Sequence, residues 1–179
     1  MVRALVLLFT LLVTASCSDT ITCSEAQLSP CLPAAEVATL LSFSANPQPE
    51  CGLPMDFEKG PPSDDNEAIR IWYETMVAEI PALEKAWQEA GIDTAQRARC
   101  AFSIRHNARL RARQAMKDPS QVNALEKRDL AKYGHPDGPT FCWLVVKNCR
   151  SGKTGTALYE AIIQSAARTN PAFHKSEKK

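Results

Sequence analysis

Several features that mark common enzyme classes are missing from this sequence of 179 residues. It contains three histidines, no closely spaced histidine pair and no Cys-x-x-Cys, so it lacks the usual spacings of metal ligands. A short SGKTG segment lacks both the leading glycine of a phosphate-binding loop and the strand that such a loop follows. We therefore predict neither a bound metal nor a cofactor.

Long apolar runs are also missing, except at the N-terminus. Even that run falls short of the roughly 20 apolar residues that a membrane-spanning helix needs. Arg3 supplies an early positive charge, and apolar and small residues then continue to Ala15, which is the layout of a secretory signal peptide. We predict that residues 1–16 are a signal peptide and that the mature protein is exported without a transmembrane helix.

Two processing sites fit the end of this signal peptide. Val13 and Ala15 suit an ordinary signal peptidase that cuts after Ala15. Alternatively, TASC resembles a bacterial lipobox with Cys17 as the lipidated first residue, although Thr14 stands where leucine is usual. The number of cysteines favours lipidation, because removing Cys17 from the seven leaves an even number for disulfides. We expect a lipoprotein of the periplasm or outer membrane, or alternatively a secreted protein.

The remaining six cysteines indicate disulfides in an oxidising compartment. They are Cys23, Cys31, Cys51, Cys100, Cys142 and Cys149. If Cys142 and Cys149 lie on one helix, they are ~10.5 Å apart along its axis, which is beyond the ~7 Å that a disulfide allows between Cα atoms. We therefore expect these two to pair with Cys100 or with the N-terminal cysteines, and so to staple an N-terminal arm to a helical body.

Charge is divided along the chain although the formal net charge is only +1. Residues 18–67 carry nine acids and one base, whereas residues 97–179 carry seventeen bases and six acids. A basic region of this size can attract nucleic acid, acidic lipid or an anionic wall polymer. The alternative is a solvated protein whose two halves attract each other.

The pattern predicts a mainly α fold, a small bundle of about five helices with a Pro-rich, disulfide-tied N-terminal arm. The acidic arm covers residues 17–64, the helical domain 65–171 and a basic tail 172–179. One short helix is expected in the arm, over residues 32–43. The expected helices of the domain are 65–90, with a kink or restart at Pro81, then 94–117, 119–133, 140–148 and 156–168.

A stripe of arginines in SIRHNARLRAR raises the question of which side of the helix faces the core. At ~100° per residue, Arg105 and Arg109 fall inside the apolar arc, and Arg113 lies at its margin. On the next expected helix, Asp129 falls among the inward-facing residues. An unpaired buried charge is costly, so these groups either form an internal Arg–Asp bridge or line a polar pocket that binds phosphate or carboxylate.

The pocket hypothesis assigns a role to each residue. His106 would transfer a proton, Arg105 and Arg109 would stabilise charge, and Asp129 would complete a metal-independent catalytic group. The residues expected to bind substrate are Arg113, Tyr133 and His135.

Three segments, AFSIRHNARLRARQAM, LEKRDLAKYGHPDGPTF and ALYEAIIQSAARTN, resemble the C-terminal region of some bacterial Rhs-type polymorphic toxins and related secreted proteins. The likeness covers residues 92–171. It implies an all-helical antibacterial module and assigns no catalytic residue. The signal peptide, the added cysteines and the lack of a large Rhs shell depart from that pattern and favour a stand-alone envelope protein.

Two functional hypotheses follow from these observations. The first is an exported envelope protein with a toxin-like helical domain that acts on an anionic, phosphate-bearing target, as a metal-independent nuclease would. The second is a non-catalytic envelope lipoprotein that binds a protein partner, as an inhibitor or immunity protein does. In either case the membrane is reached only through a lipid anchor at Cys17.

Overall fold

The computed structural model describes residues 21, 23–45, 49–62 and 65–169. The predicted signal peptide, the lipidation site Cys17 and the basic tail 172–179 lie outside the described residues. The described helices are α1 (Glu25–Leu28), α2 (Ala34–Leu41), a 3-10 turn (Pro49–Cys51), α3 (Asn66–Ala78), α4 (Ile80–Glu89), α5 (Thr94–Ala115), α6 (Pro119–Tyr133), α7 (Phe141–Arg150) and α8 (Gly155–Ala166).

The predicted mainly α fold is confirmed, and the described part of the chain contains no strand. Four of the helices, α3, α5, α6 and α7, begin where a short polar side chain accepts a hydrogen bond from a free backbone N–H group of the first turn. Asp65 accepts from the N–H of Glu67 at 3.0 Å, and Asp118 accepts from that of Ser120 at 2.9 Å. The bundle has one helix more than predicted, because α3 and α4 are separate helices. Pro81 lies in the first turn of α4, where its missing N–H group is tolerated.

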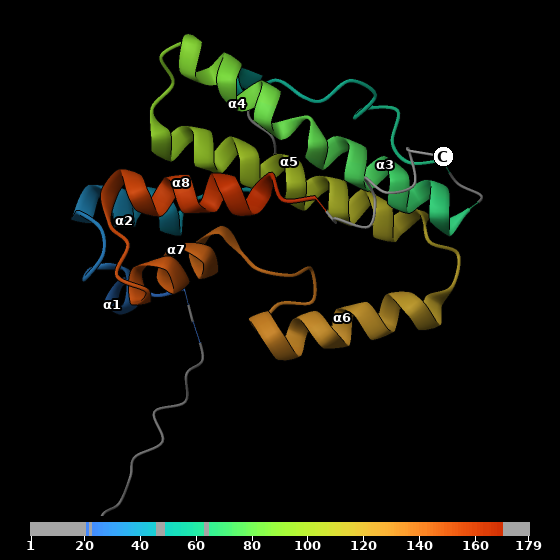
Figure 1. The fold of residues 1–179 in the computed structure, drawn as a ribbon. Helices are drawn as coiled ribbons and strands as arrows, with labels where there is room; N and C mark the ends of the chain where they lie inside the picture. Colours follow the sequence, from blue (N-terminus) through green and yellow to red (C-terminus); the bar gives the residue numbers. More distant parts are fainter. Residues whose placement is uncertain (1–20, 22, 46–48, 63–64, 170–179) are drawn as a thin grey trace, which may run out of the picture.

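The long helix α5 forms the centre of the bundle and packs against α3, α4 and α8 (Figure 1). Three alanines on its buried face, Ala98, Ala101 and Ala108, are fully inaccessible to solvent. Such small side chains let neighbouring helices approach closely, and large apolar residues of α8 such as Leu158 and Ile162 fill the space.

Three disulfides tie the N-terminal arm to the helical body. They join Cys23 to Cys142, Cys31 to Cys149 and Cys51 to Cys100. The prediction that Cys142 and Cys149 do not pair with each other is confirmed, and each bonds to a cysteine of the arm. Three disulfides indicate an oxidising compartment. Within the described ranges, no helix combines the length and apolar character needed to cross a bilayer.

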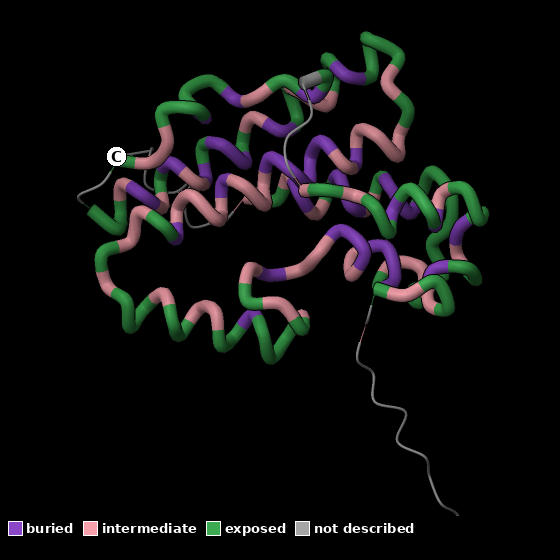
Figure 2. The backbone as a smooth tube through the Cα atoms, turned by 180° about the vertical axis from the view of Figure 1, so that it is seen from behind, coloured by how far each residue is buried: buried purple, intermediate pink, exposed green. Residues whose placement is uncertain are grey.

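Helix α6 differs from the others in how little of it is buried. Figure 2 shows it largely exposed, and its buried residue is Asp129, a carboxylate. Its backbone packs more loosely against its neighbours than those of α3, α4, α5, α7 and α8 do. The position of α6 therefore depends mainly on side-chain contacts with α5 and on the turn that leads to α7.

An arginine-lined cleft between α3, α5 and α6

A cleft of about 590 Å³ lies among α3, α5 and α6. Five of the residues that line it are arginines: Arg70, Arg105, Arg109, Arg113 and Arg128. The other lining residues are Asn66, Ile69, Tyr73, Glu74, Ala112, Met116 and Leu125. The cleft is therefore both basic and partly apolar.

Asp129 is the point at which α5 and α6 meet. Its carboxylate is 1% exposed and accepts hydrogen bonds from the Nη2 groups of Arg109 and Arg113. Arg128 approaches the other carboxylate oxygen at 3.5 Å. The internal Arg–Asp bridge expected as one alternative is thus present. Because three guanidinium groups converge on one carboxylate, the cluster carries an excess of positive charge.

The turn after α6 completes this arrangement. Arg113 Nη1 donates a hydrogen bond to the carbonyl of Pro136 at 2.6 Å and lies 3.9 Å from the carboxylate of Asp137. Gly138 is buried with a φ of 98°, and a Cβ atom there would lie 2.9 Å from Cζ of Arg109. Only glycine allows the turn to pass this close to the Arg109 guanidinium.

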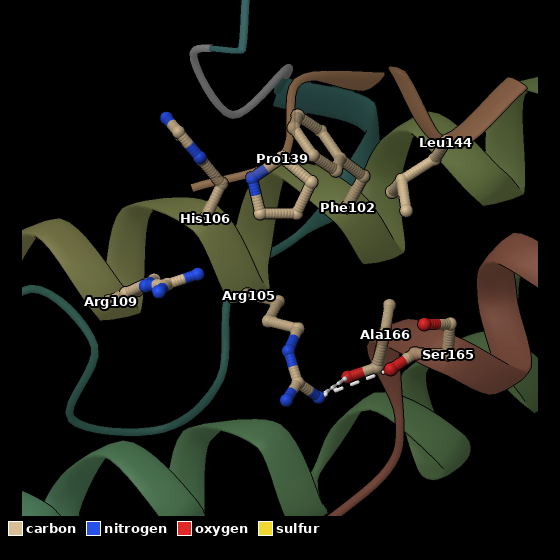
Figure 3. A pocket seen from close by; sticks show the side chains of 8 residues that line it. All are labelled: Phe102, Arg105, His106, Arg109, Pro139, Leu144, Ser165 and Ala166. Atoms are coloured by element: carbon tan, nitrogen blue, oxygen red, sulfur yellow. Dashed lines mark hydrogen bonds between the residues drawn. The ribbon is translucent and has the colours of Figure 1, made fainter. Parts of the chain in front are cut away.

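Arg105 has different partners. Its Nη1 group donates to the carbonyls of Ser165 and Ala166, at 3.2 and 2.7 Å (Figure 3). It also donates to the carbonyl of Arg168 at 2.8 Å, and so caps the C-terminus of α8. Its guanidinium also lies over the ring of Tyr73, 5.9 Å from the centroid. Burial raises the pKa of Tyr73, while the nearby Arg105 and Arg109 oppose that rise. Among the described residues, no carboxylate contacts Arg105.

His106 lies on another side of α5. Figure 3 shows Arg105 and His106 pointing in opposite directions, although both line a small cavity of about 60 Å³ that Arg109 also borders. The imidazole stacks on Phe102, with ring centroids 5.3 Å apart. Burial lowers the pKa of His106; Asp137 opposes this effect, and the positive charges nearby add to it. We therefore expect His106 to be neutral near pH 7.

The structure brings together only part of the predicted catalytic group. Arg109 and Asp129 are in contact, whereas Arg105 contacts the C-terminus of α8 and His106 stacks on Phe102. The residues predicted to bind substrate are also divided. Arg113 lines the cleft, whereas Tyr133 packs edge-on against Trp143, with centroids 4.9 Å apart. His135 is half-exposed in the turn after α6, where its Nδ1 accepts from the N–H of Asp137 at 3.2 Å.

Sequence reasoning missed the wall of the cleft that α3 provides. Arg70, Tyr73 and Glu74 follow Asn66 at helical spacing, so their common face is present in the sequence pattern. The same helix also carries an apolar stripe, which includes Ile69 and Trp72, and that stripe indicated packing alone. A row of polar residues beside an apolar stripe is the signal that would have found them.

Comparisons with protein-family models, with curated proteins and with solved structures found no match to this chain. The resemblance to the C-terminal region of Rhs-type toxins therefore stays a prediction.

Proposed function

We propose that this chain is an exported envelope lipoprotein that binds an anionic ligand in the arginine-lined cleft. The proposal rests on the volume of the cleft and on the number of arginines that line it. Ligand pockets commonly measure about 300–1,000 Å³, and the cleft falls in that range at about 590 Å³. Three of its arginines converge on the single carboxylate of Asp129, and Arg105 donates to backbone carbonyls and contacts no carboxylate among the described residues.

Arginine favours phosphate or carboxylate groups as ligands. Its planar guanidinium carries five N–H donors and can bind either group through two parallel hydrogen bonds. Arg105 directs one nitrogen to the end of α8, and Arg109 directs one to Asp129. Their existing contacts also hold these side chains in place, so a ligand would meet guanidinium groups that are already ordered.

The proposal can be tested by titrating the purified disulfide-bonded protein, residues 18–179, with pyrophosphate, citrate and a short oligonucleotide. Arg128→Gln removes a cleft arginine that is 62% exposed. Arg150→Gln, at the exposed end of α7, is the matched control because it removes an arginine outside the cleft.

We expect the Arg128→Gln substitution to weaken binding about tenfold, because a hydrogen bond to a charged group contributes roughly 1.5–3 kcal/mol. Affinity should also fall as the salt concentration rises. Equal affinities for the Arg128→Gln and Arg150→Gln proteins would contradict binding in this cleft.

A catalytic, toxin-like function is the second candidate, and the small cavity is the observation that favours it. Arg105, His106 and Arg109 all line that cavity. Its volume of about 60 Å³ is far below the roughly 300–1,000 Å³ of pockets that bind small ligands, so a nucleotide does not fit. Cleavage of a phosphodiester would require this region to open, and for that reason we favour binding.

Expression of residues 18–179 in a bacterial host with an oxidising cytoplasm separates the two functions. Growth arrest that is relieved by His106→Ala, with both proteins folded to the same extent, would support the catalytic function. Normal growth with soluble wild-type protein would leave ligand binding as the function of the cleft.

A further inference from the structure

A second surface combines aromatic rings, lysines and exposed apolar side chains. We call it the α6–α7 face, and it consists of Ile21, Leu130, Lys132, Tyr133, Trp143 and Lys147. The first five of these residues line a cavity of about 400 Å³ at the junction of α6 and α7. It is a different cavity from the arginine-lined cleft, and the two share no lining residue.

A lysine ammonium group lies over the ring of each aromatic residue of the α6–α7 face. Lys132 Nζ lies 5.2 Å from the centroid of Tyr133, and Lys147 Nζ lies 5.3 Å from that of Trp143. Both lysines are exposed, and Leu130, one turn before Tyr133, is 53% exposed. Trp and Tyr favour the headgroup region of a bilayer because their rings are apolar with one polar tip, and lysines there attract acidic lipid.

The first described residue of the chain lies at the same face. Ile21 lines the cavity, and the disulfide between Cys23 and Cys142 fixes the segment two residues later beside Trp143. Cys17 precedes Ile21 by four residues, and four residues span at most about 14 Å when fully extended. An acyl group on Cys17 would therefore enter the bilayer close to this face, whatever path the intervening residues take.

We propose that the α6–α7 face lies on the surface of a bilayer that contains acidic lipid. The inference rests on the proposed anchoring at Cys17. A lipid surface is favoured over a protein partner because the anchor would hold the bilayer within reach of the face, and because its charged side chains are lysines. The helix α6 would then contact lipid on its outer side and close the ligand cleft with its inner side.

Chemical tethering tests the orientation without depending on lipidation in the cell. In residues 17–179, Cys17 is the one cysteine outside the three disulfides, so its thiol can be coupled to a maleimide lipid in vesicles. The vesicles contain phosphatidylcholine and phosphatidylglycerol, with brominated acyl chains that quench tryptophan. Trp72 and Trp87 are 8% and 4% exposed, so Trp143 is the tryptophan placed to respond.

We expect bromolipid to quench the tethered protein, and we expect Trp143→Phe to remove that quenching. Reversing two lysines with Lys132→Glu and Lys147→Glu should weaken the contact about tenfold or more, because each basic residue near an acidic surface adds to binding. The control reverses Lys59 and Lys85, which are 78% and 77% exposed and lie outside this face; it should leave quenching unchanged.

If Trp143 in the tethered protein is as accessible to aqueous acrylamide as in the free protein, and bromolipid does not quench it, the orientation is wrong. Equal quenching for the two lysine pairs would also overturn the role of this face. Labelling of the exported chain in cells with a fatty-acid probe, compared with Cys17→Ser, tests the anchor separately. If the probe does not label the chain, Cys17 is not lipidated in cells. The orientation measured with the tethered protein would still hold.

Discussion

At the scale of single residues, Asp129 illustrates how a buried charge can position a helix. The carboxylate has lost its water, and the hydrogen bonds from Arg109 and Arg113 replace it. Removing one partner of such a group leaves the others buried without compensation, which costs far more than losing a pair at the surface. The arginine stripe is thus primarily part of the architecture, and any ligand would use groups that the fold already requires.

The first prediction concerns this carboxylate. Asp129→Asn keeps the shape of the side chain and removes its charge, so we expect the free energy of unfolding to fall by about 3 kcal/mol or more. Urea denaturation measures the change. Asp56→Asn is the control, because Asp56 is half-exposed beside Lys59 and such surface pairs contribute about 0–1 kcal/mol. Equal losses in the two proteins would mean that Asp129 does not hold α6.

The second prediction concerns Gly138. Gly138→Ala places a methyl group against Arg109, whereas Gly152→Ala has a similarly positive φ with no atom within 4 Å of the new Cβ. We expect Gly138→Ala to be the more destabilising of the two in thermal unfolding. In a background of Arg109→Ala the difference should shrink, because the overlapping group is gone. A difference that persists there would place the conflict elsewhere in the turn.

The third prediction concerns the pH dependence that His106 introduces. Because burial lowers the pKa of His106, the unfolded chain takes up a proton first as the pH falls. Stability should therefore decrease as the pH falls from about 7.5 through the ordinary histidine pKa near 6.5 towards 5.5. His106→Gln should show a smaller decrease in guanidinium denaturation. An unchanged pH profile would show that this histidine is as solvated in the folded protein as in the unfolded one.

At the scale of secondary structure, α6 combines good local signals with little burial. Asp118 caps it, Pro119 occupies its first turn and Gly134 ends it in the left-handed conformation. These features specify a helix but do not bury it. Helices that bury few apolar groups open at a lower free energy than the core.

Hydrogen exchange tests this difference, which is the fourth prediction. The amides of α6 should exchange at least about tenfold faster than those of α5 and α8, because their local opening requires less free energy. Asp129→Asn should accelerate exchange in α6 and leave α8 almost unchanged. Uniform protection of all three helices would indicate that α6 unfolds only together with the core.

The sequence was sufficient to locate most helices, because several starts have a capping residue, such as Asp65 or Asp118, and Gly134 marks an end. An internal bridge between Asp129 and an arginine such as Arg109 was one of the two alternatives that the sequence left open. The sequence could not indicate that Arg105 reaches the end of α8, because that contact joins residues 60 or more positions apart. A helical wheel gives the direction of a side chain but not the distance to the next helix, so the cleft could not be predicted either.

At the scale of the whole molecule, covalent bonds join an acidic arm to a basic body. The disulfides differ in accessibility, since Cys51 and Cys100 are 1% and 0% exposed, whereas each of the other two bonds includes an exposed or partly exposed cysteine. These cysteines are Cys23 in one bond, and Cys31 and Cys149 in the other. A reductant can attack a sulfur only where it reaches it. Burial should therefore determine the order in which the bonds are lost.

The fifth prediction follows from that difference. Under a low concentration of dithiothreitol, the Cys23–Cys142 and Cys31–Cys149 bonds should be reduced before the Cys51–Cys100 bond. Alkylation of the released thiols followed by mass spectrometry gives the order. The same experiment in urea is the control, because unfolding should remove the difference. Early loss of the Cys51–Cys100 bond under native conditions would contradict the packing of the arm described above.

The pairing of the six cysteines also has a consequence for biogenesis. If the chain is exported as we propose, Cys23 and Cys31 cross the membrane before their partners, which follow 119 and 118 residues later, and Cys51 precedes Cys100 by 49 residues. Oxidation in order of emergence would join Cys23 to Cys31, a bond that the folded protein does not contain. An exported chain would therefore reach its native pairing either if oxidation is delayed until the C-terminal half has crossed, or if a disulfide isomerase corrects the early bonds.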